Sequence, residues 1–224
     1  MLKHIPNFLT CCNLVCGCLG IIFLFEGSEI PTAYFVLIAC VFDFFDGFAA
    51  RLFKANSPIG KELDSLADMV SFGALPALFM YKTLTSSSPN DYLPYLGLLI
   101  AVCSALRLAK FNIDETQSDS FKGLPTPANA IFITTIPFLT QPIFDFVHSH
   151  VALSIITVVF SILMVFRFDL FALKFKNFSW ADNKIRFTFL ILSVLLVVLL
   201  HWAALPLLIL LYIAMSLGLQ SILK

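Results

Sequence analysis

Charged residues are scarce in this chain of 224 residues, since only 12% are charged and 59% are hydrophobic. Soluble domains carry about 25% charged residues and about 45–50% apolar residues, so a chain made mainly of soluble domains is excluded. The same composition excludes intrinsic disorder, a collagen-like repeat and a disulfide scaffold. The formal net charge is zero, which leaves no excess of positive charge for binding nucleic acid. The composition therefore predicts an integral membrane protein.

Several local signals are also missing. The six cysteines lie in apolar stretches and have no partner pair at metal-binding spacing, so we expect small packing residues without disulfides. No cleavage site of the A-x-A kind follows the first apolar run, so we expect this run to be a retained helix rather than a signal peptide. The chain contains no internal repeat and no low-complexity tract.

Long apolar stretches fill the chain instead. A membrane-spanning helix needs roughly 20 mostly apolar residues, and we expect about eight such helices in an all-α protein. Their approximate ranges are 7–25, 32–53, 61–82, 92–112, 128–147, 151–167, 186–202 and 203–222. If the N-terminus is cytoplasmic, every basic residue except Lys82 falls on the cytoplasmic side. This bias predicts that both termini are cytoplasmic.

Acidic residues interrupt the second and third of these stretches, at Asp43, Asp46, Asp64 and Asp68. Each intramembrane charge costs roughly 2.5–3.5 kcal/mol on insertion scales, so a compensating partner is expected. At about 100° per residue, the first pair of acids shares one helical face and the second pair shares another. Because only a short loop joins the two helices, we expect them to be antiparallel neighbours whose acidic faces converge near the cytoplasmic side.

The residue types around these acids indicate a ligand. Carboxylates that face each other repel, and Mg²⁺ or Mn²⁺ fits an all-carboxylate set better than Zn²⁺ does. Gly47, Ala50 and Gly60 leave space for a ligand to approach the backbone, and Arg51 offers a fork of donors to phosphate. Together these features indicate a pyrophosphate site with two metals. An acid-lined ion path, or a buried salt-bridge network with Arg51 and Lys61, is the alternative from spacing alone.

The same residues resemble the motif of the CDP-alcohol phosphatidyltransferase family, D-x2-D-G-x2-A-R-x8-G-x3-D-x3-D. All eight motif positions are present with the spacing intact, from Asp43 to Asp68. The resemblance implies a catalytic core of six helices over residues 1–167, followed by a cytoplasmic linker and two additional helices over residues 168–224. It also implies that the four Asp bind two divalent cations and that Asp68 acts as general base. The CDP-lipid contacts implied by the resemblance are Asn7, Thr10, Gly47, Ala50, Arg51, Ser57 and Gly60.

Two further stretches resemble the membrane-embedded phosphatidylserine synthases within this family. They are LRLAKFN at residues 106–112 and FKGLPTPA at residues 121–128, although Lys110 stands where Arg is more usual. This resemblance implies transfer from CDP-diacylglycerol to L-serine with release of CMP, as a step of phospholipid biosynthesis. It also implies a homodimer in the inner membrane, with the active site facing the cytoplasm. The expected acceptor-binding residues are Arg107, Lys110, Asn112, Thr126 and Asn129.

Three alternatives stay open at this point. The acceptor could be glycerol 3-phosphate or inositol, although a phosphorylated acceptor needs several clustered cations and the acceptor wall offers only Arg107 and Lys110. These two residues could instead be ordinary basic flanks of the fourth helix. From a different class, the acids could serve a cation transporter, but a transporter does not need Arg51 and two glycines at fixed offsets.

Overall fold

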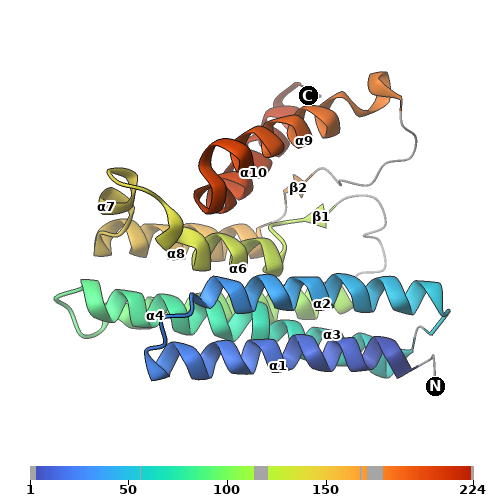
Figure 1. Cartoon of the computed structure of the whole chain (residues 1–224), viewed down its shortest axis with the longest axis horizontal. Coiled ribbons are helices and arrows are strands. Elements are labelled where there is room, and N and C mark those ends of the chain that lie inside the picture. The colour runs from blue at the N-terminus through green and yellow to red at the C-terminus, as the bar shows by residue number, and fades with distance from the viewer. Residues whose placement is uncertain (1–3, 56, 114–120, 167, 171–178, 223–224) are drawn as a thin grey trace.

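The computed structural model describes residues 4–55, 57–113, 121–166, 168–170 and 179–222 of the chain, and the part it describes is built almost wholly of helices (Figure 1). The N-terminal half forms α1 (Ile5–Glu26), α2 (Thr32–Leu52), α3 (Pro58–Asp68), the π-helix η2 (Met69–Ala74), α4 (Leu75–Ser87), the 3₁₀ helix η3 (Leu93–Gly97) and α5 (Leu98–Ile113). The rest forms β1 (Phe121–Lys122), α6 (Thr126–Thr135), the 3₁₀ helix η4 (Ile136–Phe138), α7 (Ile143–Val147), α8 (His150–Val165), β2 (Asp169–Leu170), α9 (Trp180–Leu200), the 3₁₀ helix η5 (His201–Ala203) and α10 (Ala204–Ile222).

Five segments of the described chain are long and apolar enough to cross a membrane. They are Ile5–Glu26, Thr32–Leu52, Pro58–Ser87, Leu93–Ile113 and Asn183–Gly218. The last of them contains the expected span 186–202 and most of the expected span 203–222. Within it, η5 lies between α9 and α10, which pack against each other as the expected helical hairpin (Figure 1). The prediction of a multi-pass α-helical membrane protein is therefore confirmed, whereas eight separate spans are not.

The two remaining expected spans are shorter helices. The stretch 128–147 is not one continuous helix, because α6 ends at Thr135 and is followed by η4 and then α7. Pro137 lies in η4 and Pro142 precedes α7, and a proline ring removes a backbone donor and clashes with the preceding helical turn. The next stretch, α8, is an apolar helix of only 16 residues. The hydrophobic composition was apparent from the sequence, but the interruption was not anticipated.

Some of the basic residues behind the topology prediction lie outside the described residues. These are Lys3, Arg167, Lys174, Lys176 and Lys224. The cytoplasmic location of the termini therefore stays a prediction.

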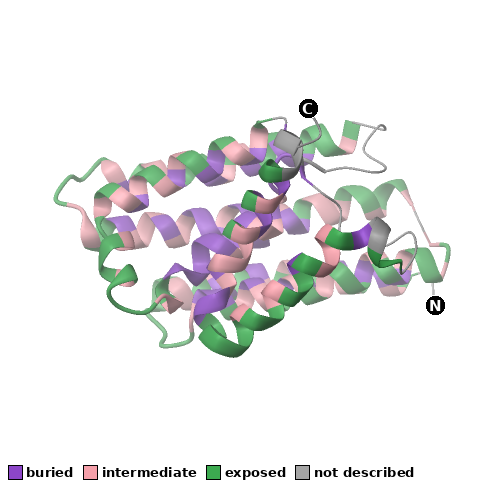
Figure 2. Cartoon of the chain, turned by 90° about the horizontal axis from the view of Figure 1, so that it is seen from above, coloured by how far each residue is buried: buried purple, intermediate pink, exposed green. Residues whose placement is uncertain are grey.

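The helices pack in layers, with α1 to α4 on one side of the molecule, α6 and α8 beside them, and the α9–α10 hairpin on the far side of α6 (Figure 1). One buried cluster joins α4, α5, α6, α8 and α10. A second joins α2, η2, the start of α4 and α6, and half-buried residues of α1 pack against it. Viewed from above, the buried residues gather in the interior, and exposed residues follow the outer helix faces (Figure 2). Many of those exposed residues are large and apolar, including Val194, Val198 and Leu199 on α9. A continuous apolar exterior of this kind is what a lipid environment requires.

A short strand pairing fixes the segment that follows α5. Phe121 and Lys122 pair antiparallel with Leu170 and Asp169. Gly123 follows with a φ of +77°, and a Cβ there would lie 2.8 Å from the backbone oxygens of Met164 and Phe166. Only glycine fits this conformation and this close approach. The pairing therefore places the start of α6 beside α5, where the expected acceptor-binding residues lie.

Candidate active site

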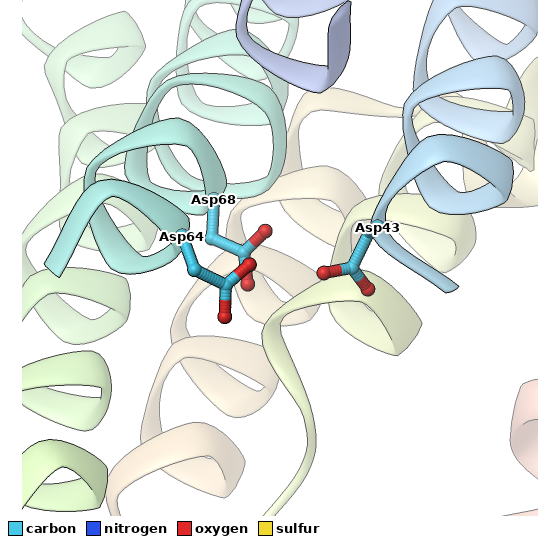
Figure 3. Close-up of side chains that lie close together, drawn as sticks. All are labelled: Asp43, Asp64 and Asp68. Carbon is cyan, nitrogen blue, oxygen red and sulfur yellow. The ribbon is translucent and has the colours of Figure 1, made fainter. Parts of the chain in front are cut away.

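Three of the motif acids come together in space. Asp43 lies on α2, whereas Asp64 and Asp68 lie one turn apart on α3. Figure 3 shows their carboxylates pointing into a common gap, and one oxygen of each lies within 4.8 Å of the others. The acidic faces of the two helices thus converge, as their spacing predicted.

Asp46, the fourth acid, lies outside this three-acid group. It is 6% exposed, and its Oδ2 accepts a hydrogen bond of 2.7 Å from Oγ1 of Thr10 on α1. Asp46 and Asp64 nevertheless line the same cavity. The acid cluster is therefore elongated, with Asp46 at one end and Asp43 and Asp68 towards the other.

Local sequence explains how the two acid-bearing helices start and stop. The chain turns after α2 at Phe53 and Lys54, where Lys54 adopts a φ of +49°. Ser57 then caps α3, because its Oγ accepts a hydrogen bond from the backbone N–H of Gly60 at 3.1 Å, and Pro58 occupies the first turn. Helix α1 packs against both α2 and α3 and covers the gap between them. The acids thus face each other beneath α1.

Helix α1 contributes a second polar contact that the sequence analysis missed. Asn13 is fully buried, and its Nδ2 donates a hydrogen bond to Oδ1 of Asp68 at 3.1 Å. An amide in the middle of an apolar span needs a polar partner, so Asn13 itself was the available signal. It lies three residues after Thr10, so both donors project from one face of α1.

A first cavity of about 210 Å³ lies on the Asp46 side of the cluster. Its lining includes every expected CDP-lipid residue except Arg51, and also Pro6, Asp46, Ala55, Lys61 and Asp64. An added Cβ at Gly47 would meet nothing within 4 Å, so the backbone there faces open space. Arg51 is exposed at the end of α2 and does not line this cavity. The motif glycines and small residues thus surround a space beside the acids.

A second cavity of about 310 Å³ lies on the Asp68 side. It is lined by residues of α2, α3, α5 and the start of α6, namely Asp43, Lys61, Asp64, Ser65, Asp68, Arg107, Leu108, Phe111, Asn112, Pro125, Thr126 and Pro127. Asp64 and Lys61 line both cavities. The acid cluster therefore lies between two spaces, which is the arrangement that a reaction between two substrates requires.

The expected acceptor-binding residues divide into two groups. Arg107, Asn112 and Thr126 line the second cavity. Lys110 is exposed and Asn129 is fully buried, and neither is part of that lining. The structure thus brings three of the five expected residues to the acids.

The sequence analysis missed Ser65 as a residue of this wall, and it named Lys61 only as a salt-bridge partner of the acids. Lys61 donates from its ammonium to the backbone oxygen of Asn112 at 2.6 Å, and Ser65 donates from Oγ to Oδ1 of Asn112 at 3.1 Å. Their spacing was a usable signal, because positions 61 and 65 fall on one helical face with Asp68. Arg107 is held in a similar way, since its Nε donates to the backbone oxygen of Leu124 at 2.5 Å.

The acid cluster is chemically suited to a hard divalent cation. It offers only carboxylate oxygens, and Oδ1 of Asp64 is buried without a hydrogen-bond partner among the described residues. Mg²⁺ and Mn²⁺ take oxygen ligands, whereas Zn²⁺ favours His and Cys. A buried carboxylate oxygen without a donor is costly in the protein alone, so the residues present fit a bound cation.

Comparison with known proteins adds independent information. The family model described as CDP-alcohol phosphatidyltransferase matches residues 3–220, which is nearly the whole chain. A CDP-diacylglycerol--serine O-phosphatidyltransferase of Bacillus subtilis (strain 168) is 36% identical over 146 residues, covering 63% of this chain and 80% of that protein. An archaetidylserine synthase of Methanothermobacter thermautotrophicus is 32% identical over 163 residues, covering 72% of this chain and 66% of that protein.

A third similar protein is matched over a smaller share of its own length. It is a CDP-diacylglycerol--serine O-phosphatidyltransferase of Mycobacterium tuberculosis (strain ATCC 25618 / H37Rv). It is 36% identical over 137 residues, which is 58% of this chain but only 47% of that protein. The matched region thus spans about half the length of this mycobacterial relative.

Proposed function

We propose that this chain, which belongs to the CDP-alcohol phosphatidyltransferase family, transfers the phosphatidyl group of CDP-diacylglycerol to L-serine and releases phosphatidylserine and CMP. The observation that carries the proposal is the position of the acid cluster between two cavities, with the family's motif residues on one side and a basic, polar wall on the other. The names of the similar proteins support serine as the acceptor.

The proposed donor site is the first cavity. The pyrophosphate of CDP-diacylglycerol lies there beside Gly47, Ala50 and Gly60, and the backbone at Gly47 faces open space. Asn7, Thr10 and Ser57 add polar groups to the same lining. Arg51 follows Ala50, which lines this cavity, and from outside the lining it would offer a planar fork of donors to the donor phosphate.

The proposed metal ligands are the four motif acids, which together would hold two Mg²⁺ or Mn²⁺ ions. Such cations neutralise phosphate charge and stabilise the leaving group of a phosphoryl transfer. The support from this chain is the all-oxygen donor set of Asp43, Asp64 and Asp68, together with Oδ1 of Asp64, which has no hydrogen-bond partner within the described part of the chain. Asp46 serves the donor side of the cluster, and Asp43 serves the acceptor side.

The proposed reaction is an in-line displacement at the β-phosphorus, the phosphorus that bears diacylglycerol. The serine hydroxyl oxygen forms the new P–O bond, the bond to the CMP oxygen breaks, and the hydroxyl proton passes to a base. None of the four histidines lines either cavity, so a carboxylate is the available base. Asp68 fits this role because it lines the acceptor cavity. Asn13 donates to its Oδ1, so Oδ2 is the oxygen available to take the proton.

The proposed acceptor site is the second cavity. Arg107 is positioned to bind the α-carboxylate of serine, and Asn112 and Thr126 supply neutral polar groups nearby. A phosphorylated acceptor would need more cationic charge than Arg107 and Lys61, both of which already donate to backbone oxygens. Lys110 and Asn129 contribute at most indirectly, because neither lines this cavity.

We place the catalytic core in residues 1–167, because both cavities are lined from within that range. The α9–α10 hairpin packs on this core through α6. The acid-bearing end of the molecule also carries Arg51, Lys54 and Lys61. Under the positive-inside rule this end faces the cytoplasm. The location in the inner membrane of a prokaryotic cell and the homodimer are proposed from the family resemblance.

The test is an acceptor panel with purified protein and CDP-diacylglycerol. Serine, glycerol 3-phosphate and inositol are supplied separately, and CMP release and the lipid product are measured for each. We expect product with serine alone. Product with another acceptor would correct the substrate, and absence of CMP release with all three would contradict the enzyme assignment in favour of an ion path.

A further inference from the structure

The contact between Asn13 and Asp68 has features that packing alone does not require. Asn13 is fully buried in the middle of α1, and its Oδ1 has no hydrogen-bond partner among the described residues. Its Nδ2 bond to Asp68 is therefore the side-chain hydrogen bond that the structure shows for it. An amide that is buried and only partly satisfied costs stability, so an apolar residue of similar shape would pack there at lower cost.

Asn13 lies outside both cavities. The donor cavity is lined by Thr10 from the same helix, and the acceptor cavity is lined by Asp68, but Asn13 belongs to neither lining. It therefore cannot touch a substrate held in these spaces. Its effect on the reaction must pass through the carboxylate that it binds.

Asn13 is itself held in place by the helix that carries Asp68. Ser71 Oγ donates to the backbone oxygen of Asn13 at 2.9 Å. Ser71 lies in η2, the π-helical turn that begins directly after Asp68. A Cβ at Gly17 would lie 2.5 Å from Ser71 Oγ and 2.8 Å from its Cα, so α1 and η2 are in the closest contact that glycine allows.

Two reciprocal hydrogen bonds thus connect one turn of α1 with the junction of α3 and η2. π-Helical turns are rare and often lie at functional sites, because the widened turn changes the direction of nearby side chains. Here the turn follows the proposed base immediately. The result is that Asp68 cannot rotate freely, since one carboxylate oxygen is tied to a rigid neighbouring helix.

We propose that Asn13 is a positioning residue that holds Oδ1 of Asp68 and so directs Oδ2 towards the acid cluster and the acceptor cavity. The inference rests on the proposed function for the role of Asp68, but the hydrogen bond itself concerns the acid cluster alone. Polar residues that orient ligands and bases typically contribute a factor of about 10–100 in metal affinity or activity. Asn13 contributes this factor by fixing geometry and takes no part in the chemistry.

The main variant is Asn13→Leu, which keeps the shape of the side chain and removes its donor. The matched control is Thr157→Val on α8, a helix that lines neither cavity. Thr157 is fully buried and polar, and its hydroxyl donates to the backbone oxygen of Leu153. Ser71→Ala provides a second variant that leaves Asn13 intact and loosens its backbone. Each protein is measured for thermal unfolding in detergent, for Mn²⁺ binding by electron paramagnetic resonance, and for CMP release.

For Asn13→Leu we expect kcat or Mn²⁺ affinity to fall by about 10–100-fold, with KM for CDP-diacylglycerol at saturating metal changed by less than about threefold. Ser71→Ala gives a smaller change in the same direction, and Thr157→Val leaves both quantities at wild-type values. The double variant Asn13→Leu with Asp68→Asn loses no more than Asp68→Asn alone, because both substitutions act through one carboxylate.

Additive losses in the double variant would overturn the proposal, as would wild-type kcat and Mn²⁺ affinity in Asn13→Leu. If Asn13→Leu fails to fold, Ser71→Ala decides the question, and wild-type behaviour there overturns it. If the wild-type protein releases no CMP, the proposed function fails. The Mn²⁺ measurement then judges the role of Asn13 independently.

Discussion

Arg107 on α5 donates from Nε to the backbone oxygen of Leu124 at 2.5 Å, across the entrance to α6. Leu124 is held there because Gly123 turns with a positive φ, and the N–H of Gly123 donates to the backbone oxygen of Phe168 at 2.8 Å. This hydrogen bond holds the guanidinium of Arg107 beside the acceptor cavity and limits the rotamers that the long side chain can adopt. This contact links the short strand pairing to the proposed recognition of serine.

Arg107→Ala is predicted to raise KM for serine at least about tenfold while changing KM for CDP-diacylglycerol much less. The reason is loss of a charge-assisted bond to the acceptor carboxylate, which is worth about 1.5–3 kcal/mol. Steady-state CMP release with each substrate varied in turn measures both constants. Lys110→Ala is the matched control, because Lys110 lies one turn away but is exposed and outside the cavity lining. If KM for serine and KM for CDP-diacylglycerol stayed at wild-type values in both variants, Arg107 would be only a basic residue flanking the membrane span.

Removal of divalent cations is predicted to abolish the transferase activity. EDTA would leave the carboxylates of Asp43, Asp64 and Asp68 facing one another without a counter-charge, and the pyrophosphate without neutralisation. Adding Mg²⁺ or Mn²⁺ in excess restores CMP release, which a coupled assay for CMP detects. Full activity in EDTA would contradict the assignment of these acids as metal ligands.

Asp68→Asn is predicted to lower kcat by roughly 10²–10⁴, the usual contribution of a positioned base. The substitution conserves shape, so the fold is retained and the protein still binds CDP-diacylglycerol, as equilibrium binding in detergent would show. A variant with near wild-type kcat would place the base elsewhere, with Asp64 or a water molecule as the next candidates.

Gly17→Ala is predicted to destabilise the fold by about 1–3 kcal/mol, because the new methyl group overlaps Ser71 and pushes α1 away from η2. Gly218→Ala on α10 is the matched control, since a Cβ there meets nothing within 4 Å. Alanine is the better helix former, so this control is neutral or slightly stabilising. Thermal unfolding in detergent compares the two, and an equal melting temperature for both would contradict close packing of α1 on η2.

Much of the proposed site was predictable because its signals are local. The spacing of Asp43 and Asp46, and that of Asp64 and Asp68, determines which helical face each pair occupies. Because α3 begins at Pro58, only a few residues after α2 ends at Leu52, both faces lie at the same end of the molecule. Contacts between distant segments were not predictable in this way. Nothing near Asn13 in sequence shows that it bonds Asp68, 55 residues later.

The sequence by itself determined the membrane class and the identity of the acids. It also located four of the five long apolar segments, with ends within about five residues of those observed. These features were predictable because hydrophobicity, helical period and motif spacing are properties of neighbouring residues. The break in the fifth expected helix is a local effect of Pro137 and Pro142, which the sequence already contained. Only the tertiary structure decided that Lys110 and Asn129 stay out of the acceptor cavity, and that α1 supplies hydrogen bonds to two of the acids. The physical reason is that these features depend on how closely helices approach and how they rotate about their axes. That approach is set by pairs such as Gly17 and Ser71, which meet only when the whole chain has packed.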